Sequence, residues 1–138
     1  MKKNSATSLI TSIKGKNKKN SLFTPKKIIN LNPKNVDFYS FRTGLKKSNT
    51  DLIILDFKKL IPVSSVYSKT STPSAPIIWD KKNNKGKCRI LIVNSGNANA
   101  HTGKLGIKKI DKYVNVISKS FDCSSSEALV SSTGVIGE

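Results

Sequence analysis

The segment that most restricts the fold is residues 88–93, which read Cys-Arg-Ile-Leu-Ile-Val. An apolar run of this length, rich in β-branched residues, is typical of a central strand covered on both faces. Residues 94–100 then follow as Asn-Ser-Gly-Asn-Ala-Asn-Ala, a string of small side chains. The chain is therefore predicted to leave a buried strand through a loop that carries little bulk.

A helix is predicted after this loop, because apolar residues recur at helical spacing over residues 107–121. The residues that set the spacing are Ile107, Ile110, Val114, Ile117 and Phe121. Thr102 or Gly103 is expected to begin the helix. Beyond its end, Ser124 and Glu127 have the spacing of a capping box, which predicts the start of another element.

The first half of the chain is predicted to consist mainly of short strands. Residues 36–41 alternate imperfectly before a turn, and residues 51–56 form a β-branched run with an Asp at each end. Residues 62–67 are interpreted as a further strand that begins at Pro62, and residues 77–79 as a strand or a helical turn. Several strands before the first clear helix predict an α+β fold.

Composition divides the chain into a basic leader, residues 1–35, which is predicted to be flexible, and a domain, residues 36–138. The formal net charge of +17 would attract nucleic acid non-specifically. Nearly all the cations are Lys, with Arg only at Arg42 and Arg89, whereas specific recognition of bases and phosphates favours Arg. Specific nucleic-acid binding is therefore disfavoured, and a small basic RNA- or ribosome-binding protein is kept as the alternative hypothesis.

The sequence carries no segment with the apolar length of a signal peptide or a membrane span, so the cytoplasm is the expected compartment. Cys88 and Cys123 are widely separated and lack the spacing of metal ligands. No metal site is predicted.

Two segments carry residues suited to chemistry at a carbonyl group. The first, residues 94–100, supplies amide and hydroxyl groups on a backbone that glycine makes permissive. Five of its residues are therefore candidates for a loop that forms a substrate pocket. These are Asn94, Ser95, Gly96, Asn97 and Asn99. In the second, Thr133 and Gly134 can offer a hydroxyl and a backbone N–H to the oxyanion of an acyl-transfer intermediate. The alternative for each is an ordinary turn, stabilised by Asn side chains in the first case and by glycine in the second.

Together the two segments resemble the ornithine acetyltransferase family, in their order and in their separation by a helix. The residues that carry the likeness are Val93-Asn-Ser-Gly-Asn-Ala-Asn-Ala100 with Thr102-Gly103, and Ser132-Thr-Gly-Val-Ile-Gly137. A weaker match is Phe41-Arg-Thr-Gly-Leu-Lys-Lys47. The likeness extends from about residue 36 to residue 138.

The resemblance implies an acyltransferase of arginine biosynthesis that moves an acetyl group from N-acetylornithine to glutamate. It implies a four-layer αββα sandwich, and a precursor that cleaves itself to free an amino-terminal Thr nucleophile on a second chain. By this likeness Thr133 and Gly134 build the oxyanion hole. No cofactor is implied, and acetyl-CoA serves as the acetyl donor in some members.

The sequence stops at Glu138, directly after the expected oxyanion hole. We therefore expect a truncated sandwich: an amino-terminal fragment, or one half of a split protein, that lacks the nucleophile and is inactive alone. Its expected partners are the small-molecule substrates and the family's second chain, in a hetero-oligomer.

Overall fold

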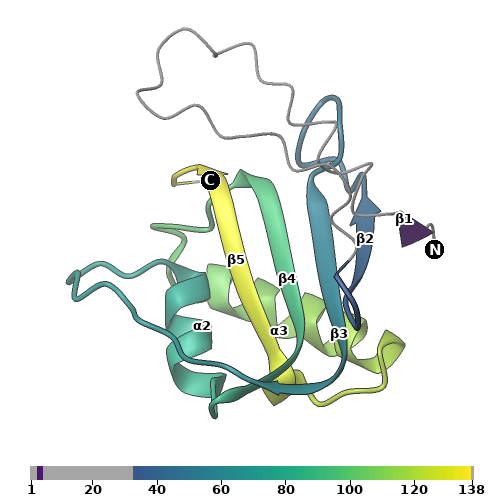
Figure 1. Ribbon diagram of the computed structural model, residues 1–138. Helices are drawn as coiled ribbons and strands as arrows, with labels where there is room; N and C mark the ends of the chain where they lie inside the picture. The colour runs from purple at the N-terminus through teal and green to yellow at the C-terminus, as the bar shows by residue number, and fades with distance from the viewer. Residues whose placement is uncertain (1–2, 5–32, 138) are drawn as a thin grey trace, which may run out of the picture.

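The computed structural model describes residues 3–4 and 33–137, and within them five strands form one mixed sheet (Figure 1). In sheet order they are β1 (Lys3–Asn4), β2 (Asp37–Phe41), β3 (Leu52–Pro62), β4 (Lys87–Asn97) and β5 (Ala128–Val135). The pairings from β1 to β4 are antiparallel, and β4 pairs with β5 in parallel. Most of the predicted flexible leader, residues 1–35, lies outside the described residues.

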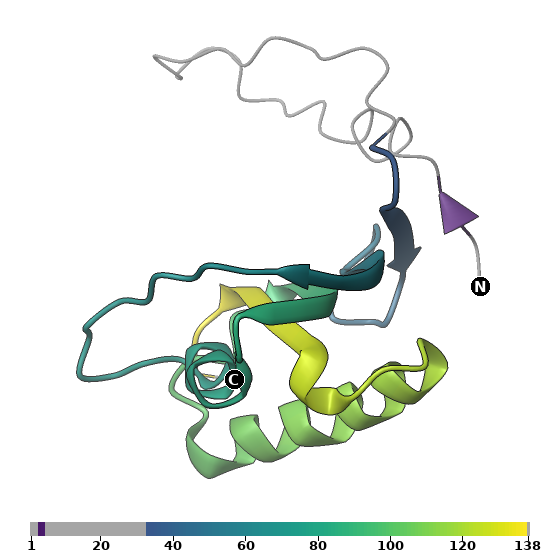
Figure 2. The ribbon, with the colours of Figure 1, turned by 60° about the horizontal axis from the view of Figure 1, so that its bottom comes forward.

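The helices of the described chain lie on one side of this sheet (Figure 2). Helix α3 (Gly103–Ser120) connects β4 to β5 and covers one face, while α2 (Ala75–Asn83) lies beside β5 and contacts α3. A 3-10 turn, η1 (Ser125–Glu127), leads into β5. The connection through α3 is a crossover, which the parallel pair β4 and β5 requires, because the chain must return to the other end of the sheet before β5 begins.

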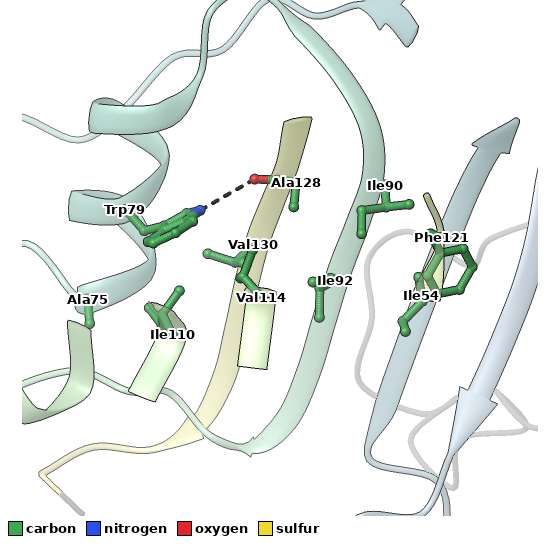
Figure 3. Close-up of a cluster of buried hydrophobic side chains, with 10 residues drawn as sticks. All are labelled: Ile54, Ala75, Trp79, Ile90, Ile92, Ile110, Val114, Phe121, Ala128 and Val130. Atoms are coloured by element: carbon green, nitrogen blue, oxygen red, sulfur yellow. Dashed lines mark hydrogen bonds between the residues drawn. The ribbon is translucent and has the colours of Figure 1, made fainter. Parts of the chain in front are cut away.

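The core lies between the sheet and these two helices (Figure 3). Its buried members are Ile54, Ala75, Trp79, Ile90, Ile92, Ile110, Val114, Phe121, Ala128 and Val130. Ile110 and Val114 are fully buried, as the helical spacing predicted. Trp79 is only 6% exposed, and its indole N–H donates a hydrogen bond of 3.4 Å to the carbonyl of Ala128. This bond attaches α2 to the beginning of β5.

Both predicted helix signals are confirmed. Helix α3 begins at Gly103, with Thr102 as its N-cap residue. The capping box is present at η1, where the Ser124 N–H donates to Glu127 Oε2 at 2.8 Å. The strand predicted before the first turn is also confirmed, as β2.

Two boundaries differ from the predictions, and the alternative left open at residues 77–79 is decided. Pro62 ends β3 instead of beginning a strand, and residues 63–67 have no regular structure. Strand β3 pairs with β2 only as far as Asp56, so Pro62 lies where β3 has a described neighbour on one side alone, and proline is tolerated at such an edge position. Residues 77–79, predicted as a strand or a helical turn, are helical and belong to α2, where Pro76 occupies the first turn that proline favours. Strand β4 continues to Asn97, so the first half of the predicted loop is paired with β5.

The face of the sheet opposite the helices is also apolar. Side chains alternate along a strand, so the residues between those of the core point to this second face. They are Phe38, Ile53, Leu55, Leu91, Val93 and Leu129. Leu129 is buried and the other five are half-buried. Within the described part of the chain, neither helix lies over this face (Figure 2). We call these six residues the second face.

Candidate functional site

The parallel pairing of β4 and β5 brings the two predicted segments together at the carboxyl ends of both strands. The ladder aligns Asn94 with Ser132, Ser95 with Thr133, and Gly96 with Gly134. Helix α3 separates these segments in sequence, and the crossover returns the chain so that they become neighbours. The structure therefore joins what the sequence showed as two separate candidates.

Two glycines allow the backbones to approach closely at this point. Gly134 has a φ of 133°, and a Cβ added to it would lie 2.3 Å from the carbonyl carbon of Gly96. Gly96 has a φ of 112°, and its added Cβ would lie 2.9 Å from the carbonyl oxygen of Leu45. Side chains other than hydrogen are excluded at both positions, because backbone atoms fill the space and positive φ disfavours a Cβ.

Thr133 is exposed on an edge strand. Side chains alternate along β5, and those of Val130 and Ser132 point to the α3 side of the sheet. The side chain of Thr133 therefore points to the second face and away from α3. The carbonyl of Val135 accepts a hydrogen bond of 2.8 Å from the Ala98 N–H, which shows that Val135 bonds toward β4. The amide of Gly134, one residue earlier, therefore faces away from β4, at the edge of the sheet where β5 has no second neighbour among the described strands.

Helix α2 covers only the first part of this edge. The Val130 N–H donates to Asp80 Oδ1 at 3.0 Å, and Ala128 is bonded to Trp79. From residue 133 onward the side chains of β5 are exposed. The Thr133 hydroxyl has no hydrogen bond within the described residues, so it remains free to donate. An exposed hydroxyl and an outward backbone N–H thus lie on adjacent residues.

A cavity of about 690 Å³ lies on the other side of the sheet, beside α3. Its wall is formed by Thr43, Gly44, Leu45, Leu52, Ile92, Asn94, Asn97, Asn99, His101, Thr102, Leu105, Gly106, Lys109, Tyr113, Ile117 and Gly137. Of the predicted pocket residues, Asn94, Asn97 and Asn99 line it, whereas Ser95 and Gly96 do not. Thr133 and Gly134 do not line it either.

Comparison with known proteins identifies the group to which this arrangement belongs. The sequence model of the ArgJ family matches residues 37–138. The chain belongs to the ArgJ family. The ArgJ arginine biosynthesis bifunctional protein of Bradyrhizobium diazoefficiens is 44% identical over 93 residues, 67% of this chain and 22% of the relative. The protein of the same name from Mesorhizobium japonicum is 42% identical over 97 residues, 69% of this chain and 24% of the relative.

Solved ArgJ structures share the fold. The crystal structure of the bifunctional ArgJ protein of Bacillus halodurans superposes with a TM-score of 0.71 at 32% identity, covering 76% of this chain and 56% of that one. The ornithine acetyltransferase of Mycobacterium tuberculosis, solved in complex with ornithine, gives 0.68 at 26% identity and covers 77% and 59%. The chain thus spans about a quarter of the length of the curated ArgJ relatives named above.

Other kinds of site find no support in the described part of this ArgJ chain. Across residues 3–4 and 33–137, no group of three or more His, Cys, Asp or Glu side chains is placed to hold a metal ion. Cys88 and Cys123 are free thiols. Neither described helix has the length and apolar character that a membrane span requires.

Asp51 is a residue of the site whose role the sequence did not reveal. Its carboxylate is buried and accepts hydrogen bonds from the Thr43 N–H (2.6 Å), the Gly44 N–H (3.0 Å) and the Lys46 N–H (3.1 Å). Burial opposes ionisation, but these bonds and one from the Thr43 hydroxyl lower the pKa of Asp51 to about 2. Asp51 thereby fixes the loop that forms one wall of the cavity. The sequence feature that could have indicated this role is the position of an acidic residue between a Thr-Gly turn and an apolar run.

Replacing Asp51 by Asn should lower the thermal midpoint at neutral pH by several degrees, because an amide offers one acceptor atom where the carboxylate offers two. The wild-type contribution is present above the unfolded pKa of 3.8 and is lost as the pH falls through about 2. The variant should lack this acid-dependent loss. Thermal unfolding across that pH range measures both effects, and Asp111→Asn, an exposed carboxylate on α3, is the control. Equal behaviour of the two variants would contradict the role given to Asp51.

Asp80, beside the edge of β5, has a raised pKa where Asp51 has a lowered one. Burial raises its pKa to about 6, and the hydrogen bond from the Val130 N–H offsets part of that rise. An acid with a raised folded-state pKa stabilises the protein below its unfolded pKa of 3.8, and this contribution is lost as the pH rises through about 6.

Asp80→Asn should therefore stabilise the chain at neutral pH. An amide oxygen can still accept the Val130 N–H, and no charge has to be buried. Because the side chain is only partly buried, we expect a gain of about 1 kcal/mol rather than the full linkage value. Denaturant unfolding at pH 7 and at pH 4 measures it, and the gain should vanish at the lower pH. A loss of stability at pH 7 would show that the charged form is needed.

Proposed function

We propose that this chain supplies the oxyanion-stabilising part of an acetyltransferase that moves acetyl from N-acetylornithine to glutamate, with acetyl-CoA as a second candidate donor. The observation that carries the proposal is the ladder that places Thr133 and Gly134 beside Ser95 and Gly96 on the uncovered part of an edge strand. Membership of the ArgJ family and the ornithine complex of the Mycobacterium tuberculosis homologue support this substrate class. The expected compartment is the cytoplasm.

In the proposed reaction, a Thr hydroxyl of a second chain attacks the acetyl carbonyl carbon of N-acetylornithine. The carbonyl oxygen becomes negatively charged, and the Thr133 hydroxyl and the Gly134 N–H donate hydrogen bonds to it. The tetrahedral intermediate collapses, the C–N bond breaks, and ornithine leaves with the proton taken from the nucleophile. The neutral amine of glutamate then attacks the acetyl ester, and a second oxyanion forms at the same donors. As the ester C–O bond breaks, the proton lost by the amine returns to the Thr oxygen, which gives N-acetylglutamate and the free Thr.

The exposed position of Thr133 supports this role. A group that stabilises charge at a reacting carbonyl must be reachable, and its hydroxyl and the outward amide of Gly134 are both free of other described elements. Ser95 is aligned with Thr133 and shares its face of the sheet. We therefore place Ser95 and Gly96 at the transfer site, and Asn94, Asn97 and Asn99 in the wall of the cavity beside α3.

The second face is proposed as the surface on which the other sheet of a four-layer αββα sandwich packs. Its six residues are apolar, and sheets pack face to face through surfaces of this kind. The Thr133 side chain points to the same side, which would place it between the two sheets. The second chain would then bring both the opposing sheet and the nucleophile.

Co-expression with a second chain that begins at the family's nucleophilic Thr tests the proposed function. Acetyl exchange between N-acetylornithine and labelled glutamate should require both chains. A second chain whose first residue is Ala in place of Thr is the matched control, and it should assemble without activity. An assembled pair that shows no exchange with either donor would overturn the proposal.

A further inference from the structure

The side chain of Asn94 connects the two strands that form the proposed transfer site. Its Nδ2 donates to the carbonyl of Asn97 at 2.8 Å, and its Oδ1 accepts from the hydroxyl of Ser132. The orientation of the amide follows from its partners, because a backbone carbonyl can only accept and so must face the NH₂ group. One side chain thus binds its own strand, β4, and the neighbouring strand, β5.

The bond to Asn97 spans the irregular part of β4. Between its two ends lie Ser95 and Gly96, and Gly96 has a φ of 112°. A strand with a glycine in this conformation is not held straight by ordinary side-chain sterics, because glycine can adopt many other conformations. The Asn94 amide closes the segment and thereby restrains the position of the Gly96 backbone.

The bond to Ser132 extends that restraint to the proposed oxyanion donors. Ser132 immediately precedes Thr133, and Gly134 packs against the backbone of Gly96 so closely that an added Cβ would overlap it. Asn94 therefore restrains the position of Gly134 in two ways. Its bond to Ser132 holds β5 two residues before Gly134, and its bond to Asn97 holds the Gly96 backbone against which Gly134 packs.

We propose that Asn94 is a positioning residue that aligns Thr133 and Gly134 with the oxyanion, and that Ser132 is its partner; this inference rests on the proposed function. Asn94 points to the α3 side of the sheet, whereas the Thr133 side chain points to the second face. It therefore contacts neither the substrate nor the reacting atoms, and its contribution should appear in turnover and not in substrate binding.

The experiment uses the assembled two-chain enzyme with Asn94→Ala, Ser132→Ala, the double variant, and Ser132→Thr. We expect each alanine variant to lower kcat by about 10- to 100-fold with little change in KM, because small displacements at a reacting centre cost this much. The double variant should be no worse than the single ones, since they break the same link. Ser132→Thr keeps the hydroxyl and should recover most of the activity.

The chain offers a matched control in a second Asn–Ser side-chain pair. Ser125 Oγ donates to Asn115 Oδ1 at 2.5 Å, between η1 and α3. This pair lies before the start of β5, whereas the proposed site lies at its carboxyl end. Asn115→Ala should leave kcat unchanged. Effects of Asn94→Ala and Ser132→Ala that multiply in the double variant, or that appear only in KM, would overturn the proposal.

Hydrogen exchange of the assembled protein separates this inference from the proposed function. Asn94→Ala should speed amide exchange in residues 131–137 by about tenfold relative to Asn115→Ala, as expected for the loss of one restraining hydrogen bond. This readout does not need catalysis. Unchanged exchange in residues 131–137 would overturn the role of Asn94 even if the enzyme is active, whereas faster exchange in an inactive assembly would count only against the proposed reaction.

Discussion

Replacing Thr133 by Ala should reduce acetyl transfer by the assembled enzyme by about a hundredfold or more, since one oxyanion donor is lost from the transition state. The loss should fall on kcat, because the donor acts on a charge that is absent from the bound substrate. Stability should change little, because Thr133 is exposed and its hydroxyl has no partner within the described residues. Steady-state kinetics and thermal unfolding of the same preparation measure the two quantities.

Thr133→Ser separates the hydroxyl from the rest of the side chain and should keep most of the activity. Ser131→Ala removes a nearby exposed hydroxyl from the same face of β5 and should have little effect. Full turnover in Thr133→Ala, or an equal loss in Ser131→Ala, would show that the Thr133 hydroxyl does not stabilise the oxyanion.

Replacing Gly134 by Ala should destabilise the chain by about 2–4 kcal/mol and disturb the site at the same time. The added methyl group would lie 2.3 Å from the carbonyl carbon of Gly96 and 2.6 Å from the Asn97 nitrogen. These are backbone atoms of a paired strand, so they cannot move aside as the end of a flexible side chain can. Chemical denaturation of the variant measures the loss.

Gly86→Ala is the control that separates the backbone strain of a positive φ from the overlap of the added methyl group with neighbouring backbone atoms. Gly86 also has a positive φ, 76°, but an added Cβ would meet no atom within 4 Å. Its variant should show only the backbone strain, about 1 kcal/mol. If the two variants lost equal stability, close approach of the backbones at Gly134 would not be the cause.

Local patterns in the sequence predicted those parts of the fold that local physics determines. The spacing of Ile110 and Val114 predicted the buried side of α3, and Ser124 with Glu127 predicted the turn before β5. The strand predicted to begin at Pro62 was wrong, because Pro62 ends β3 beyond the part that pairs with β2, where a proline is tolerated as it is at the start of a strand. Residues 77–79 were ambiguous because three apolar residues are too few to show a period, and they form part of α2.

The candidate site needed information that no local pattern contains. Composition identified the segment around Asn94 and the segment around Thr133, but the parallel register that aligns them depends on how the crossover through α3 returns the chain. The direction of Thr133 away from the cavity follows from strand alternation, once β5 is known to include it. Asp51 was interpreted as a strand end because its four donors lie on a loop that only the folded chain brings to it.

The parallel ladder between β4 and β5 also affects how variation in this family should be interpreted. Because both strands end at the same edge, an insertion or deletion within the connecting helix would change the count of residues between the two segments without altering which residues face each other. A fixed interval along the chain is therefore a poor criterion for recognising distant relatives. A better one is whether a glycine in the first segment can be matched with a glycine in the second, at the place where the two main chains nearly touch.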